Sequence, residues 1–350
     1  MTGVSLFSSA GIAEYYFDQV GIDIIAANEL IEERANLYSK TYQNSTMIAG
    51  NILDHNVFKR IVEISDKKID FLIASPPCQG MSMAGKNRNA AEMVKDTRNY
   101  LVLKVIDFIS IIKPRFILIE NVPNFLKLNL SFQGQIYTLP DLLVKLFGDK
   151  YNVEAEVLDA ANFGVPQRRT RAIIKMYIRG EKWGWLSTQP QQTVQEVIGN
   201  LPSIESGQKS SVKWHFSRKH SDNHVLWMKH TPTGHSAFEN TKYFPTKENG
   251  EKIKSYMTTY RRIKWDEPAP TITMRNDAIS SQLNVHPGRK LDDGTYSDAR
   301  VLTPLELMLL SSLPKDWKIP DDTPELLIRK CIGECIPPQL IRNIVAQINQ

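Results

Sequence analysis

The chain has 350 residues, with 43 Lys and Arg, 38 Asp and Glu, three Cys and 42% hydrophobic residues. This length accommodates one large or two medium domains, and the composition excludes a disordered, collagenous or disulfide-framework protein. No apolar run reaches the roughly 20 residues that span a membrane. No signal peptide is visible at the N-terminus, so we expect a cytoplasmic enzyme or binding protein.

Residues 1–180 alternate short β-branched runs with longer amphipathic runs. Several of the predicted strands are apolar without alternation, which indicates a sheet covered on both faces. We therefore predict an α/β fold with a mostly parallel, doubly wound sheet that places ligands at the carboxyl ends of its strands. The predicted strands are Val4–Phe7, Asp23–Ala27, Ile69–Ala74, Arg115–Glu120, Val153–Leu158 and Ala172–Ile178, and the predicted helices are Ala13–Val20, Ile31–Tyr42, Val57–Ile64, Tyr100–Ile112 and Leu139–Phe147.

From about residue 181 to residue 320 this rhythm stops, and Pro, Gly, Asn and Thr punctuate short runs. Residues 181–300 carry most of the net charge of +5, every histidine except His55 and every tryptophan except Trp317. A smaller loop-rich domain, α+β or mostly β, is predicted here, and the helix Pro337–Ile348 is predicted to return to the first domain. A basic, aromatic region suits an anionic partner such as nucleic acid, and it equally suits a small domain with an ordinary aromatic core.

The first two predicted strands end in groups that suit a nucleoside. The turn Leu6–Gly11 consists mostly of small residues, which let backbone N–H groups approach a cofactor at a helix N-terminus. Glu29 follows at the end of the second strand, at a spacing where a carboxylate can accept hydrogen bonds from both hydroxyls of a ribose. A nucleoside site is favoured over a surface glutamate.

The next strand leads to a cysteine in a rigid turn. Pro76 and Pro77 fix the backbone after the strand and hold Cys78 at its carboxyl end. A lone thiol is more often a small buried hydrophobe, but the polar segment that follows favours a reactive cysteine.

Charged side chains follow the later strands. Glu120 ends its strand just before Asn121, so it is a candidate general acid or base. Arg169 and Arg171 have period-two spacing, so their guanidinium groups are predicted to point the same way, toward a carboxylate, phosphate or base.

Taken in order, these motifs resemble those of the cytosine-C5 DNA methyltransferase family of bacterial and phage restriction-modification systems, over nearly the whole chain. The resemblance continues in the segments 300–306 and 333–338. It implies a Rossmann-like S-adenosylmethionine-dependent methyltransferase domain at residues 1–180, a target-recognition (DNA-binding) domain at 181–320 and a segment at 321–350 that returns to the catalytic domain. It also implies DNA (cytosine-5-)-methyltransferase activity on a cytosine flipped out of a specific short duplex sequence.

The resemblance implies roles residue by residue. Cys78 would be the nucleophile that adds to cytosine C6, Glu120 would hold N3 and the exocyclic amine, and Arg171 would contact the O2 side. Arg169 would support the loop, and Asn121 and Gln79 would support the reacting groups. The implied S-adenosylmethionine contacts are Phe7, Ser9, Gly11, Glu29, Leu30, Asn51, Pro77, Leu101 and Cys335. The implied DNA contacts are Ser82, Lys86 and Arg98 in a mobile loop, Gly80–Asn99, and Arg261, Arg262, Arg275 and Asn276 in the target domain.

Four residues depart from the family pattern. Ser9 and Ile12 stand where glycine is usual, Asn51 stands where aspartate is usual, and Glu334 stands where asparagine is usual. None of them touches the covalent chemistry, so we expect activity with an altered affinity for the cofactor.

No metal site is expected, because Cys331 and Cys335 lack a second pair of ligands nearby and read as packing residues. The expected partners are double-stranded DNA and a cognate restriction endonuclease encoded nearby, for a monomer in the cytoplasm of a bacterial or phage-infected cell.

Two alternatives stay open. A tRNA cytosine-C5 methyltransferase would share these motifs, but the long target domain favours duplex DNA. A catalytically silent DNA-binding relative would have no need of Cys78, Glu120 and Arg171. The residues do not give the recognised DNA sequence.

Overall fold

The computed structural model describes residues 1–66, 68–77 and 101–349 and divides the chain into two compact units. Unit 1 comprises Met1–Asp159, Thr170–Ser187 and Ile341–Gln350, and unit 2 comprises Ala160–Arg169 and Thr188–Leu340. These bounds differ from the predicted 1–180, 181–320 and 321–350 mainly in two segments. Residues 160–169, between two strands of unit 1, belong to unit 2, and so do residues 321–340 of the segment predicted to return to the first domain. The functional roles of the two units remain predictions.

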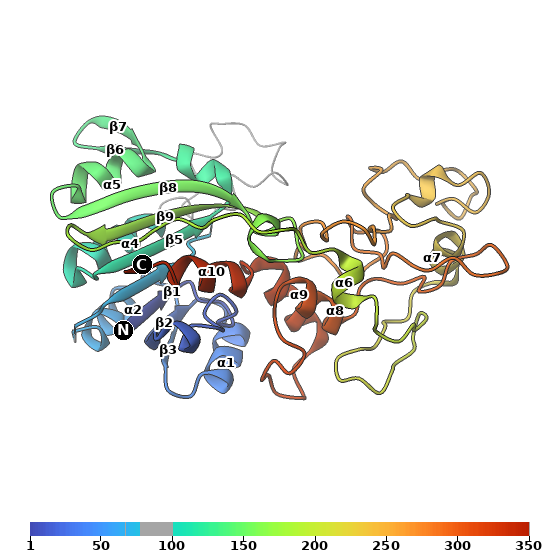
Figure 1. Cartoon of the computed structure of the whole chain (residues 1–350), viewed down its shortest axis with the longest axis horizontal. Helices are drawn as coiled ribbons and strands as arrows, with labels where there is room; N and C mark the ends of the chain where they lie inside the picture. Colours follow the sequence, from blue (N-terminus) through green and yellow to red (C-terminus); the bar gives the residue numbers. More distant parts are fainter. Residues whose placement is uncertain (67, 78–100, 350) are drawn as a thin grey trace. The chain divides into compact units, whose positions relative to one another are not determined.

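Unit 1 is built on a seven-stranded sheet with the order β3-β2-β1-β4-β5-β9-β8 (Figure 1). The first five strands are parallel, whereas β9 runs antiparallel to both β5 and β8. The predicted α/β fold with a mostly parallel, doubly wound sheet is confirmed. The strands are β1 (Thr2–Leu6), β2 (Asp23–Glu29), β3 (Thr46–Ala49), β4 (Phe71–Ala74), β5 (Phe116–Asn121), β8 (Tyr151–Asp159) and β9 (Thr170–Ile178), with a separate antiparallel hairpin of β6 (Asn129–Phe132) and β7 (Gln135–Thr138).

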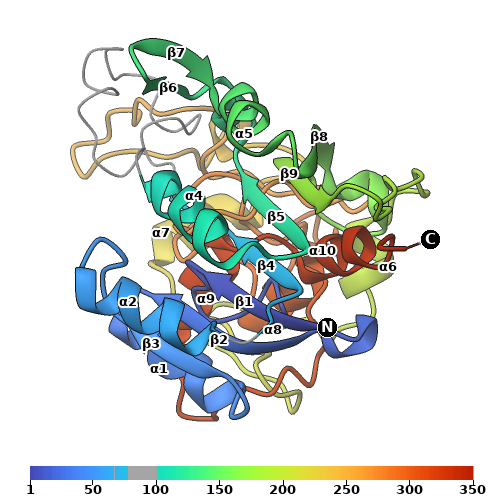
Figure 2. The same cartoon turned by 90° about the vertical axis from the view of Figure 1, so that its left-hand side faces the viewer.

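One face of this sheet is covered by α2 (His55–Ile64), α4 (Leu101–Ile112) and α5 (Leu139–Phe147), which share a continuous apolar core with the strands (Figure 2). Val4 and Leu72 belong to this core. Side chains alternate between the two faces of a strand. Phe71 and Ile73, which flank Leu72 in β4, therefore point to the opposite face of the sheet.

The opposite face is covered by aromatic side chains and the C-terminal helix. Trp183 lies 6.2 Å from the ring of Phe71 and 5.8 Å from that of Phe116. Its indole N–H donates a hydrogen bond to the Ile344 carbonyl in α10 (Pro338–Val345) at 2.8 Å. Within the described residues no helix is long and apolar enough to cross a membrane.

The segment after β1 differs from its prediction. A helix over Ala13–Val20 is wrong, because the segment forms hydrogen-bonded turns and then a short 3-10 helix, η1 (Asp18–Val20). Glu14 N–H donates to the Gly11 carbonyl, an i to i+3 bond that closes a turn instead of continuing an α-helix. The α-helix begins later, as α1 (Glu32–Thr41).

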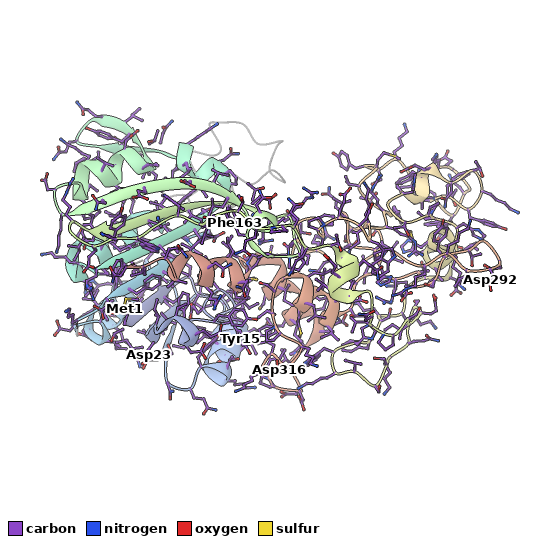
Figure 3. The ribbon with its side chains drawn as sticks, viewed as in Figure 1. Met1, Tyr15, Asp23, Phe163, Asp292 and Asp316 are labelled. Carbon is purple, nitrogen blue, oxygen red and sulfur yellow. The ribbon has the colours of Figure 1, made fainter. Side chains whose placement is uncertain are left out.

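β1 and β2 start level with each other, and β2 extends one residue beyond the end of β1. Figure 3 labels Met1 and Asp23 at the starts, where the Asp23 N–H donates to the Met1 carbonyl at 2.9 Å. β3 and the β6–β7 hairpin were not predicted, because these four-residue strands are half exposed and carry no long apolar run.

Unit 2, all of whose residues are described, contains isolated bridges but no named strand, so the predicted α+β or mostly β domain is wrong in that respect. An apolar core in unit 2, separate from that of unit 1, includes Trp227, Tyr260 and Val285. The frequent Pro and Gly residues of this unit interrupt the hydrogen-bond ladders that a β-sheet requires. Its helices are η5 (Ala160–Phe163), α6 (Val194–Ile198), α7 (Asp222–Lys229), η6 (Ala237–Glu239), α8 (Pro304–Leu310) and α9 (Glu325–Glu334).

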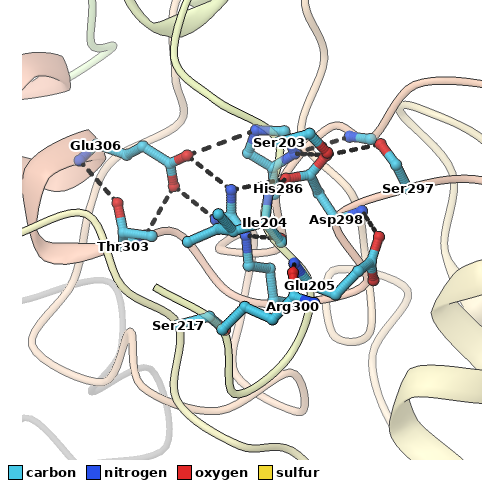
Figure 4. Close-up of polar contacts among 12 residues, drawn as sticks. Ser203, Ile204, Glu205, Ser217, His286, Ser297, Asp298, Arg300, Thr303 and Glu306 are labelled. Atoms are coloured by element: carbon cyan, nitrogen blue, oxygen red, sulfur yellow. Dashed lines mark hydrogen bonds and ion pairs between the residues drawn. The ribbon is translucent and has the colours of Figure 1, made fainter. Parts of the chain in front are cut away.

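A buried ion network organises unit 2 (Figure 4). Arg300, fully buried, binds the Glu306 carboxylate through both terminal nitrogens at 2.8 and 2.9 Å. It also donates to Asp298 at 2.8 Å and to the Ile204 carbonyl at 2.7 Å. Glu306 accepts the Thr303 N–H at 2.7 Å in the capping box that begins α8. One guanidinium therefore links three segments where a sheet ladder is missing.

The charges in this network support one another. Burial would raise the pKa of Glu306, but the positive charge of Arg300 overcomes this and holds the pKa well below its usual value. Burial lowers the pKa of the adjacent His286 to about 3, so its imidazole is neutral near pH 7.

We predict that Arg300→Met destabilises the protein by about 3–5 kcal/mol at pH 7, because it leaves the carboxylates of Asp298 and Glu306 buried without their cation. Urea denaturation measures this loss. Lys213→Met is the control, since its partner Asp321 and Lys213 itself are both exposed, and it should cost at most about 1 kcal/mol.

The stability difference between Arg300→Met and the parent protein should depend on pH. Because the folded-state pKa of Glu306 is lowered, the ion pair stabilises the protein above the unfolded-state pKa near 4.5 and loses that effect as pH falls. In Arg300→Met the orphaned carboxylates can take up protons, so the difference from the parent protein should shrink between pH 7 and pH 4. An unchanged difference would contradict the electrostatic explanation.

Candidate active site

The ends of four parallel strands meet at one edge of the unit 1 sheet. Leu6, the last residue of β1, is paired with Asn28 in β2 and with Ala74 in β4. Ala74 in turn is paired with Ile119 in β5. The turns that follow these strands are therefore neighbours, as expected for the ligand-binding edge of such a sheet.

Glu29 ends β2 at this edge with its carboxylate held by two backbone groups. One oxygen accepts the Ser9 N–H at 2.9 Å, and the other accepts the Ile31 N–H at 2.8 Å. Each carboxylate oxygen can accept a second hydrogen bond. Glu29 is therefore oriented and keeps the acceptor capacity that a pair of ribose hydroxyls requires.

The β1 turn, residues 7–11, approaches this carboxylate in an unusual conformation. Phe7, Ser9 and Gly11 have φ values of 60°, 50° and 74°. Only glycine adopts positive φ without cost, so surrounding contacts must hold the other two residues. The Tyr42 hydroxyl donates to the Gly11 carbonyl at 2.6 Å, and a Cβ added at Gly11 would collide with the Tyr42 ring. No motif in the sequence pointed to Tyr42.

Two leucines in the loops after β2 and β3 are open to solvent: Leu30 follows Glu29 directly, and Leu53 lies in the loop after β3. Leu30 is 64% exposed and Leu53 is 49% exposed. Asn51 Oδ1 accepts the Leu53 N–H at 3.0 Å, which fixes the loop after β3. Pro77 and Leu101 are partly buried. Exposed leucines beside an oriented carboxylate suit a planar, apolar ring attached to a ribose.

The departures from glycine in the β1 turn have different outcomes. Ile12 is 1% exposed, so its side chain packs in the interior. Ser9 keeps the positive φ expected of glycine.

Glu120 and Arg171 form an ion pair at the end of β5. Arg171 Nε lies 2.9 Å from Glu120 Oε1, and both side chains are largely buried. The pairing of Glu120 with Ile173 explains this contact, because the antiparallel β9 begins where β5 ends. A charged partner fixes the orientation of the carboxyl group and leaves its second oxygen outside this pair.

Asn121 connects the end of β5 to the turn after β4. Its side-chain amide donates to the Pro76 carbonyl at 2.6 Å, and its Oδ1 accepts the Val122 N–H at 2.9 Å. Asn121 therefore fixes the backbone two residues before Cys78, and its predicted support of the reacting groups stays a prediction.

Arg169 does not share a target with Arg171, so the predicted convergence of the two guanidinium groups is wrong. Arg169 lies in unit 2 with 2% exposure and donates to the carbonyls of Ile272, Gly333 and Glu334 at 2.8, 3.2 and 2.7 Å. The ladder begins only at Thr170, so the alternation assumed from a continuous strand does not extend to Arg169.

Five predicted site residues lie outside the described part of the chain, and their roles stay predictions. They are Cys78, Gln79, Ser82, Lys86 and Arg98.

Two of the four predicted DNA contacts in unit 2 are interior residues, so we withdraw them as direct contacts. Arg262 is fully buried, and its terminal nitrogens donate to the carbonyls of His286 and Met228 at 2.7 and 2.9 Å. Asn276 is 1% exposed and donates to the Thr273 carbonyl at 2.6 Å. Both side chains stabilise loops, a use of polar groups that charge in the sequence does not distinguish from surface binding.

The other two predicted DNA contacts in unit 2, Arg275 and Arg261, remain accessible to solvent. Arg275 is exposed, and Arg261 is partly exposed and paired with Glu239 at 3.1 Å. Cys335 and Glu334 lie in unit 2, and the predicted cofactor contact of Cys335 stays a prediction. Among the described residues, no group of three or more His, Cys, Asp or Glu could hold a metal ion.

Comparison with known proteins agrees with the motifs. The chain is 58% identical over 347 residues to the Type II methyltransferase M1.HgaI of Avibacterium volantium, covering 99% of this chain and 97% of that protein. It is 26% identical to the Type II methyltransferase M1.HphI of Haemophilus parahaemolyticus, covering 99% and 86%.

Solved structures share the fold. The Entamoeba histolytica methyltransferase EhMeth matches with a TM-score of 0.66 and 15% identity, covering 99% of this chain and 97% of that one. A variant of Spodoptera frugiperda DNMT2 matches with a TM-score of 0.60 and 15% identity, covering 98% and 99%. The family model described as C-5 cytosine-specific DNA methylase matches residues 1–350. The resemblance inferred from the motifs is thus confirmed: the chain belongs to the C-5 cytosine-specific DNA methylase family and is a DNA (cytosine-5-)-methyltransferase.

Proposed function

We propose that this enzyme uses S-adenosylmethionine to methylate C5 of a cytosine flipped out of a specific short duplex sequence, through a covalent adduct of Cys78 with C6. The Glu120–Arg171 pair at the end of β5 carries this proposal, because it presents a fixed carboxyl group beside the turn that leads to Cys78. The name of the Type II relative M1.HgaI supports a restriction-modification role, with a cognate endonuclease encoded nearby.

The covalent step is needed because C5 of cytosine is too weak a nucleophile to attack a methyl donor directly. Addition of the Cys78 thiolate to C6 forms an S–C6 bond and moves electron density onto C5 and toward N3 and O2. Glu120 shares a proton with N3 and accepts a hydrogen bond from the exocyclic amine, and Arg171 stabilises the developing charge at O2. After methylation, loss of the C5 proton and elimination of Cys78 restore the aromatic ring.

The residues at the strand edge fit S-adenosylmethionine, which when bound would supply an electrophilic methyl group. Glu29, oriented by two backbone N–H groups, would accept the ribose hydroxyls. Leu30 would flank the adenine, and Asn51 would face its amine. The β1 turn would carry the methionine part, with Pro77 and Leu101 nearby.

Duplex DNA is the proposed substrate, and unit 2 would supply much of the contact. Arg261 and Arg275 are the two target-domain candidates that keep solvent access. Phosphate contacts by such residues would make affinity fall with rising salt concentration.

The first test is bisulfite sequencing of DNA from cells that lack cytosine methylation and express this protein. We predict protected cytosines within one short motif, and complete loss of protection in Cys78→Ala because the nucleophile is gone. Cys331→Ala is the matched control, since Cys331 is a buried thiol in α9, and it should keep the methylation pattern.

Full conversion of DNA by bisulfite despite soluble wild-type protein would contradict the proposal for DNA. The same cells then provide tRNA for bisulfite sequencing, where protected cytosines would identify RNA as the substrate.

Glu29→Gln tests the cofactor site. One side-chain oxygen becomes an NH2 group, which would face a backbone N–H donor, so we predict roughly ten-fold or greater loss of S-adenosylmethionine affinity by calorimetry. Glu32→Gln, an exposed residue in the first turn of α1, should bind as the parent protein does. Equal affinity of the two variants would rule out the assigned role of Glu29.

Arg171→Leu tests the pair at the end of β5. DNA carrying 5-fluorocytosine in the recognised motif cannot lose a proton from C5, so it retains the covalent adduct. We predict at least a roughly ten-fold lower rate of adduct trapping on denaturing gels, because Glu120 loses its orienting charge. A parent-like rate would show that the ion pair does not serve the covalent step.

A further inference from the structure

A buried carboxyl group lies behind the β1 turn, and the chemistry proposed above assigns it no role. Glu14 is 4% exposed. Its Oε2 accepts a hydrogen bond from the Tyr38 hydroxyl of α1 at 2.9 Å, and its Oε1 accepts one from the Ser5 hydroxyl of β1. The Tyr38 hydroxyl also lies 3.2 Å from Ser45 Oγ. This carboxyl group therefore joins the first strand, the first helix and the residues that follow the turn.

The same cluster holds the turn itself. The ring of Tyr42 packs against that of Tyr38 at a tilt of 39° with a centroid separation of 4.7 Å, and its hydroxyl donates to the Gly11 carbonyl at 2.6 Å. The Glu14 N–H donates to that carbonyl at 3.3 Å. Phe7 and Ser9 hold positive φ, which their own preferences disfavour, so the turn needs such support from behind.

We propose that Glu14 is a positioning residue for the S-adenosylmethionine site: held by Ser5 and Tyr38, it fixes the β1 turn in the conformation that receives the cofactor. This inference rests on the proposed use of that cofactor. Glu14 acts through the backbone of residues 7–11 and through Tyr38 and Tyr42. An already ordered turn saves the cofactor the cost of ordering it on binding.

The ionised form of Glu14 suits this role best. Burial raises the pKa of Glu14 to about 7, and hydrogen bonds from two hydroxyls oppose the rise. The titratable groups around it are Tyr38 and Tyr42 and, near Tyr42, Tyr15 and Asp18; burial raises the pKa of Tyr38 and Tyr42, so both stay neutral. Both carboxyl oxygens accept hydrogen bonds, and a proton on either would displace a donor. Cofactor binding should therefore weaken as pH falls from 8 to 6.

The test compares two variants that each remove one buried hydroxyl group. Tyr38→Phe removes a donor to Glu14, whereas Tyr151→Phe removes a hydrogen bond of 2.8 Å to the Pro114 carbonyl and leaves the turn untouched. Calorimetry of the full chain with S-adenosylhomocysteine should give roughly five-fold weaker binding for Tyr38→Phe at pH 8 and no change for Tyr151→Phe.

Glu14→Gln supplies the readout that a purely structural role would not change. The parent protein should lose affinity between pH 8 and pH 6, whereas Glu14→Gln should bind weakly at both values with little difference between them. In the cofactor-free protein, amide exchange in residues 8–13 should be faster in Glu14→Gln and Tyr38→Phe than in Tyr151→Phe.

Parent-like affinity in both Glu14→Gln and Tyr38→Phe would overturn the inference, as would a parent-like pH dependence in Glu14→Gln. Failure of the parent protein to bind S-adenosylmethionine or S-adenosylhomocysteine would instead overturn the proposed cofactor. Amide exchange would then still decide whether Glu14 orders the turn.

Discussion

The antiparallel placement of β9 beside β5 is the constraint on which the candidate active site depends. In a parallel arrangement the last residues of β9 would lie beside the end of β5, and they are apolar. Because β9 runs in the opposite direction, its first residues lie there, and Arg171 reaches Glu120 at 2.9 Å. The chain also leaves unit 1 at Asp159 and re-enters it at Thr170 on this edge.

The two units provide hydrogen-bond partners for their buried backbone N–H and carbonyl groups in different ways. Unit 1 pairs its carbonyls and N–H groups in a sheet whose core is apolar. Unit 2 has few ladders, so buried guanidinium groups satisfy its loop carbonyls: Arg262 binds those of Met228 and His286, and Arg300 binds that of Ile204. A buried carbonyl left unpaired costs about 1–3 kcal/mol, and each of these guanidinium groups pairs with more than one carbonyl. This explains why a region rich in Arg and Lys commits several of them to its interior.

The strand edge at which we propose that the cofactor binds combines a conformation that local preferences disfavour with tertiary contacts that enforce it. Positive φ at Phe7 and Ser9 brings the Ser9 N–H to Glu29, and the cluster of Glu14, Tyr38 and Tyr42 supports the turn from the opposite side. Rigid support of this kind places binding groups accurately before the ligand arrives. Ile12, which stands where glycine is usual, directs its side chain into the interior, where it is 1% exposed.

The sequence by itself determined the α/β class, most strands of the sheet, the family and the strand-end positions of Glu29 and Glu120, because hydrophobic period and motif order are local properties of the chain. Only the tertiary structure decided which charges are accessible, since Arg261 is partly exposed while its neighbour Arg262 is buried. It also decided that Arg169 binds loop carbonyls while Arg171 pairs with Glu120. It also revealed Glu14, whose partners come from β1 and α1. Burial and pairing arise from residues distant in the chain, so no local pattern encodes them.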